Sequence, residues 1–162
     1  MNAIYEMKHL LFEELELIVK TSSNLIAKIK PDHWDYRPAG NMRSLKELVQ
    51  HLVSVPAVDL LILQENSQPV IQELEEKINA ELDKDKLIGW MTSGAEDVKR
   101  YMDQLPDEDF MHKKTKPFYL EHGTVQAKWL IEIVTHAQHH RAQTFNYMKT
   151  LGYEVNMFDL YG

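Results

Sequence analysis

Three histidines near the C-terminal end of the sequence have a spacing that suits metal binding on a helix. They lie in the run His136-Ala137-Gln138-His139-His140-Arg141-Ala142-Gln143. His136 and His140 are four residues apart, so on a helix they share one face with Cβ atoms about 5–6 Å apart. The pair His136 and His139 also satisfies helical geometry. Two imidazoles at such a spacing can reach one cation, but a reactive metal site needs a third protein ligand.

His51 is the candidate for that third ligand. It follows Leu48 by three residues and precedes Val55 by four, which places it on the buried side of an earlier helical pattern. In the later helix, apolar spacing puts His136 and His140 within or beside the buried stripe. His139 lies about 100° from His140 around the helix, so we expect it to face a flank.

Burying three imidazoles costs free energy of folding unless their ring nitrogens are hydrogen-bonded or bind a metal. A divalent cation satisfies three nitrogens at once; the alternative is a non-catalytic helical binding protein whose histidines are core residues. Three neutral ligands leave the charge of the ion uncompensated, so it would acidify a bound water toward a pKa of about 7 or favour a bound thiolate. Glu132, Asp59 and Gln143 are candidates for a general base, and the pattern singles out none of them.

Two other metal architectures do not fit the spacing. A di-iron carboxylate bundle needs Glu-x-x-His on two helices and two further glutamates. Glu6 and His9 have that spacing, but no second helical copy follows, and Glu132 and His136 are four residues apart. A zincin needs His-Glu-x-x-His, and the run from His136 to His140 has no glutamate in second position.

The composition is that of one globular domain spanning residues 1–162. A hydrophobic content of 44% is enough for a packed core. The absence of cysteine excludes disulfides, thiolate nucleophiles and Cys-ligated metals, and it fits a cytoplasmic location. A formal net charge of −7 argues against sequence-independent nucleic-acid binding, which relies on surplus Lys and Arg.

Nothing in the sequence predicts a signal peptide or a membrane span. Charged residues, Glu6 and Lys8 among them, interrupt the N-terminal segment early. The most apolar stretch, residues 52–63, contains Pro56 and Asp59 and is too short to cross a bilayer. We therefore expect no membrane partner.

Apolar residues recur at helical spacing in four long segments. These run from about Ala3 to Ile29, from Ser44 through Ile62, from about Asp85 to Leu105, and from about Thr124 to Leu151. Ser44-Leu45-Lys46-Glu47 has the form of a capping box at the start of the second helix. Thr124 is the expected N-cap of the fourth helix and Gly152 its C-terminal stop.

The segments between these helices differ in character. Residues 30–43 form a connector rich in turn residues, and the acidic residues 73–86 are expected to present a solvated face. Residues 106–123 have few helical signals, as in a lid, a hairpin or a binding loop. Lys113, Lys114 and Lys116 make a basic island there. The pattern predicts an all-α protein in which one helix pair is joined by a long crossover, an arrangement that places metal sites in the core of a bundle.

In its helix pattern and its histidine motifs, the chain resembles the DinB/YfiT-like family over essentially its whole length. The resemblance rests on Ser-Leu-x-Glu-Leu-x-x-His-Leu, which begins at Ser44, and on His-x-x-x-His-Arg-x-Gln, which begins at His136. The Trp-bearing connector at residues 34–41 and the Leu151-Gly152 pair agree with it. The family commonly has glycine where this chain has Ala142, so we expect an extra methyl group at a packing position.

The resemblance implies an up-down-down-up four-helix bundle. It also implies a divalent metal, nickel or zinc, held by three histidines, which by position are His51, His136 and His140. Some similar proteins are thiol-dependent transferases that use a low-molecular-weight thiol, and others are described as hydrolases. A small-molecule substrate and a homodimer are therefore expected. For Arg141 and Gln143 the resemblance favours structural or supporting roles over direct catalysis.

Overall fold

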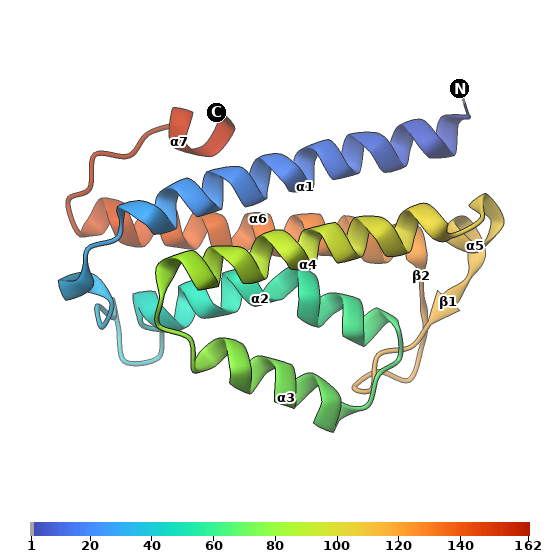
Figure 1. The fold of residues 1–162 in the computed structure, drawn as a ribbon, viewed down its shortest axis with the longest axis horizontal. Coiled ribbons are helices and arrows are strands. Elements are labelled where there is room, and N and C mark those ends of the chain that lie inside the picture. The colour runs from blue at the N-terminus through green and yellow to red at the C-terminus, as the bar shows by residue number, and fades with distance from the viewer. Residues whose placement is uncertain (1) are drawn as a thin grey trace.

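A computed structural model describes residues 2–162 and contains four long helices. They are α1 (Ala3–Lys28), α2 (Leu45–Leu63), α4 (Lys84–Gln104) and α6 (Gln126–Thr150). Helices α1 and α6 run in one direction and α2 and α4 in the other, which is the expected up-down-down-up order (Figure 1). The four predicted helical segments thus match the observed ones to within a few residues. Within residues 2–162, no helix has the length and apolar character needed to cross a bilayer.

The long crossover between α2 and α4 is itself helical. It forms α3 (Gln68–Asn79), which lies along the outside of the bundle (Figure 1). Only Ile71 and Ile78 of α3 are buried, so its charged residues face water, as expected. The buried side chain of Gln50 donates hydrogen bonds to the carbonyl oxygens of Asn79 (2.9 Å) and Glu81 (3.0 Å), which holds the end of α3 against α2.

Helix α2 begins with the predicted capping box. The Ser44 hydroxyl accepts a hydrogen bond from the Glu47 amide (3.2 Å), and the Glu47 carboxylate accepts one from the Ser44 amide (2.7 Å). Both first-turn amides are thereby satisfied within the chain. This cap fixes where the helix starts and therefore which face presents His51, seven residues later.

Helix α4 approaches α2 closely at Pro56, in the interior of α2. A Cβ atom added at Gly94 would lie 2.9 Å from the backbone nitrogen of Ala57 and 3.3 Å from Cβ of Pro56. A glycine at position 94 therefore allows the two backbones to meet. This contact sets the spacing between α4 and the helix that carries His51.

Residues 106–123 contain a hairpin, one of the three forms expected there. A short helix, α5 (Asp107–His112), precedes β1 (Lys114–Thr115), which pairs antiparallel with β2 (Thr124–Val125). The expectation that Thr124 is the N-cap of the last helix is wrong. Thr124 is paired with Thr115 in this ribbon, and Val125 occupies the cap position of α6.

The chain ends by folding back over the bundle. Gly152, with φ of +84°, terminates α6 as predicted, and the chain then reaches α7 (Phe158–Tyr161), which packs beside α1 (Figure 1). Arg141 joins the three elements: its guanidinium donates hydrogen bonds to Thr21 Oγ1 (2.9 Å) and to the Leu160 carbonyl (2.8 Å). With 2% of its surface exposed, Arg141 has a structural role.

Candidate metal centre

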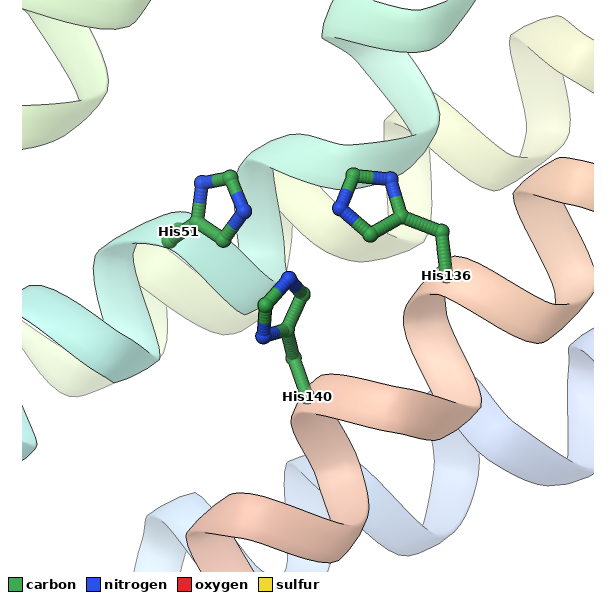
Figure 2. Close-up of side chains that lie close together, drawn as sticks. All are labelled: His51, His136 and His140. Atoms are coloured by element: carbon green, nitrogen blue, oxygen red, sulfur yellow. The ribbon is translucent and has the colours of Figure 1, made fainter.

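The three predicted ligands come together between α2 and α6. His51 extends from α2, and His136 and His140 extend from α6 on consecutive turns (Figure 2). The ring centroids are 5.4 Å apart for His51 and His136, 4.3 Å for His51 and His140, and 4.9 Å for His136 and His140. One nitrogen from each ring can be chosen so that all lie within 4.8 Å of one another.

Two of the rings are held by hydrogen bonds at their outer nitrogen. Nδ1 of His136 lies 2.9 Å from a carboxylate oxygen of Asp59, and Nδ1 of His140 lies 2.8 Å from the amide oxygen of Gln143. Because both partners are acceptors, each Nδ1 carries the proton, and Nε2 keeps its lone pair. Figure 2 shows the free nitrogens turned toward a common centre. Such orienting partners are typical of histidines that bind metals.

Burial keeps two of these rings neutral at physiological pH. Desolvation, followed by the charges of its neighbours, lowers the pKa of His51 to about 3. Desolvation also lowers the pKa of His140 to about 4, although the hydrogen bond that the ring donates to Gln143 partly opposes this shift. Only a neutral imidazole can bind a cation, so both rings are in the binding form across the physiological range.

His136 differs from the other two because of its acidic partner. The hydrogen bond to Asp59 raises the pKa of His136 above its ordinary value, and burial raises the pKa of Asp59. The Asp59 side chain is 14% exposed, so water screens this pair only weakly. The negative charge of the same carboxylate would stabilise a divalent cation bound at Nε2 of His136.

The geometry of the three nitrogens fits one small cation. Ligand atoms bonded at about 2.1 Å to one tetrahedral ion lie about 3.4 Å apart. The three nitrogens lie within 4.8 Å of one another, so inward shifts of up to about 1 Å by the rings would close the site. All three donors are imidazole nitrogens, which suit zinc and nickel better than magnesium or calcium. The residues present therefore fit the metal that the resemblance implies.

The other candidate residues are placed differently. His139 is exposed on the flank of α6, as expected. Glu132 forms an ion pair with Lys128 (2.7 Å), and among residues 2–162 no hydrogen bond or ion pair joins it to the three rings. His9, from the di-iron alternative, lies on the surface of α1 and pairs with Glu13 (3.3 Å). Among residues 2–162, the ligand group contains no carboxylate, whereas a di-iron site of this kind needs several.

Asp59 and Gln143 are the orienting residues of the site. A supporting role was expected for Gln143, whereas Asp59 was expected only as one of several candidates for a general base. Gln143 lies three residues after His140 on the same helix, so helical spacing predicts that the two side chains are neighbours. No such local signal relates Asp59 on α2 to His136 on α6. The expectation for Ala142 is wrong, because this residue is exposed and its methyl group meets solvent.

Comparisons with known proteins agree with the fold and the motifs. The DinB family model matches residues 5–162. A solved structure of a candidate DinB-family member from Exiguobacterium sibiricum 255-15 is 23% identical, with a TM-score of 0.72, and the alignment covers 96% of this chain and 97% of that chain. A DinB-like protein, YjoA, from Bacillus subtilis is 23% identical, with a TM-score of 0.69 and coverage of 90% and 94%. These two likenesses concern the fold alone. Among curated proteins, none matches this sequence.

Proposed function

This chain belongs to the DinB family, and from that premise we propose that it is a metal-dependent enzyme whose ligands are His51, His136 and His140. The observation that carries the proposal is the convergence of three imidazoles from two helices, two of them held at Nδ1 by Asp59 and Gln143. Buried histidines need acceptors for their ring protons with or without a metal, but a metal would also be a partner for the lone pairs that these rings turn toward one point.

Zinc or nickel is the proposed ion, and the substrate is a small molecule. A divalent ion with three neutral ligands would supply Lewis acidity, which lowers the pKa of a coordinated water or thiol. The reaction is therefore either hydrolysis or transfer of a low-molecular-weight thiol. Asp59 and Gln143 are positioning residues here, because each holds a ring proton at Nδ1 and so fixes the ring for binding through Nε2.

The first experiment is elemental analysis of protein purified without a polyhistidine tag and dialysed against metal-free buffer. We expect one divalent ion per chain, lost in His51→Ala and in His140→Ala. His139→Ala is the matched control, because it removes an exposed imidazole from the same helix. Full metal content in both ligand variants would overturn the assignment. No bound metal in the parent protein, even after reconstitution with zinc and nickel, would favour a non-catalytic binding module.

The second experiment separates the two reactions. The reconstituted protein is screened for ester and amide hydrolysis and, in parallel, for transfer of small thiols to electrophiles. The proposal expects one activity that disappears in the ligand variants and persists in His139→Ala. We also propose the homodimer implied by the resemblance, which sedimentation analysis tests. The cytoplasmic location stays a prediction.

A further inference from the structure

A pocket of about 530 Å³ adjoins the three histidines through Gln143. Gln143 lines the pocket and also holds the His140 ring, and Leu48, one turn before His51 on α2, lines it as well. Tyr147, one turn further along α6, is part of the same lining. The pocket has a volume typical of small-molecule sites, and Gln143 lies between it and the His140 ring.

Two arginines from the connector before α2 give this pocket its charge. The guanidinium of Arg37 is already engaged, by an ion pair with Glu47 (2.9 Å) and a hydrogen bond to the Met42 carbonyl. Arg43 differs: within residues 2–162 its guanidinium has no hydrogen-bond or ion-pair partner, and the side chain is exposed to the pocket. The pocket thus presents one uncompensated positive charge in a protein of net charge −7.

The α2 N-terminus does not compete for an anion in this pocket. Its first-turn amides are occupied within the chain: those of Leu45 and Lys46 donate to the carbonyl oxygens of Tyr36 (2.8 Å) and Trp34 (2.9 Å), and that of Glu47 donates to the Ser44 hydroxyl (3.2 Å). The carbonyl of Arg43 accepts a hydrogen bond from the Tyr147 hydroxyl (3.0 Å), which fixes its backbone against α6. The backbone of Arg43 is thus held while its guanidinium stays available.

A second pocket next to the centre has the opposite charge. Its volume is about 350 Å³, and His136 lines it together with Asp59, Glu132 and Tyr119. Asp59 is occupied by the histidine, and Glu132 is partly neutralised by Lys128, but neither side chain would accept an acidic group. His136 thus adjoins an acidic pocket, whereas Gln143, the partner of His140, lines the basic pocket. This difference in charge would orient a charged substrate.

The geometry points to a small anionic substrate, whose carboxylate or other oxyanion binds Arg43 while its reacting group lies at the three histidines. We propose Arg43 as the residue that determines this specificity. A guanidinium suits the role because it binds planar oxyanions through two parallel hydrogen bonds. The basic island at Lys113, Lys114 and Lys116 lies on the hairpin and does not line this pocket. The inference rests on the proposed metal centre for the placement of the reacting group, but not for the binding of the anion.

The test uses zinc-reconstituted protein and small hydroxamates as probes. Monohydroxamates of succinic, glutaric and adipic acid each carry a metal-binding end and a free carboxylate, and each is compared with its neutral methyl ester. Binding is measured by calorimetry. We expect at least one acid to bind about tenfold tighter than its ester. That preference should disappear in Arg43→Gln and turn toward the ester in Arg43→Glu. Arg100→Gln, which removes an exposed arginine paired with Asp97 on α4, is the control.

The outcomes separate the two proposals. Acid and ester that bind equally well, with no change in Arg43→Gln, would overturn the role of Arg43 and leave the metal centre intact. If no hydroxamate binds and no zinc is retained, the metal centre fails, and succinate is then titrated into the metal-free protein. Succinate binding that Arg43→Gln abolishes would still support the anion site, whereas binding that is absent or unchanged in the variant would refute it. Metal content measured in parallel should be the same in all Arg43 variants.

Discussion

Removing the carboxylate of Asp59 tests whether the hydrogen bond to His136 tunes metal binding. The Asp59 side chain is 14% exposed, and its oxygen lies 2.9 Å from Nδ1 of His136. In Asp59→Asn the amide oxygen can still accept the Nδ1 proton, so the hydrogen bond persists but the charge is lost. Hydrogen bonds to charged partners contribute about 1.5–3 kcal/mol and neutral ones about 0.5–1.5. The difference of about 1.4 kcal/mol corresponds to a tenfold loss of zinc affinity.

Asp59→Ala removes both the charge and the acceptor. Loss of such an orienting partner typically costs 10–100-fold in metal affinity, so we expect the alanine variant near the upper end, about 2.7 kcal/mol. The affinity is measured at pH 7 by competition with a chromophoric chelator. Circular dichroism checks that each variant remains folded.

The matched control is Glu132→Gln. This carboxylate lines the same pocket as Asp59 but pairs with Lys128, and within residues 2–162 it forms no hydrogen bond with a ligand ring, so its removal should change the zinc affinity by less than twofold. Suppose instead that both Asp59 variants bind zinc as tightly as the parent while His136→Ala has lost it. The hydrogen bond would then have no part in metal binding, and the reasoning from geometry to affinity would be refuted.

Three further predictions concern stability. The native pKa values of His51 and His140 are lowered to about 3 and about 4, so below pH 6.5 the unfolded chain binds more protons. The unfolding free energy of the metal-free protein should therefore fall between pH 6.5 and 4, by at most about 1.4 kcal/mol per pH unit for each ring; urea unfolding that is insensitive to pH would contradict this. Gly94→Ala should destabilise by about 1–3 kcal/mol because its Cβ would meet backbone at 2.9 Å. Gly89→Ala, which meets nothing within 4 Å in the same helix, should raise the melting temperature. Arg141→Ala should lower stability by about 2–3 kcal/mol through its lost hydrogen bonds and leave zinc affinity unchanged; a loss of affinity in the folded variant would assign it to the site.

The helices and the face that carries the metal ligands could be predicted from local sequence patterns. Helical periodicity is a local property, so apolar spacing located α1, α2, α4 and α6, and the Ser44 cap fixed the start of α2. The four-residue spacing of His136 and His140 follows from the pitch of a helix in the same way. Local signals also put His139 on a flank, where the structure has it.

Local signals failed where pairing with a distant segment decides the conformation. Threonine is a typical N-cap residue, but Thr124 pairs with Thr115 and therefore belongs to a strand. Ala142 was expected to pack and instead faces solvent, because the position of α1 and α7 around α6 decides which side of that helix is covered.

The surroundings of the histidines depend on how distant segments pack together. Asp59 and His136 are 77 positions apart, with a crossover helix and a hairpin between them, so their contact depends on how α2 and α6 pack. The same packing places Arg43 on the wall that Gln143 and Tyr147 complete. Side-chain chemistry and helical pitch act over a few residues, whereas the partners of a buried ring are set by the packing of whole helices, whose energy is spread over the core.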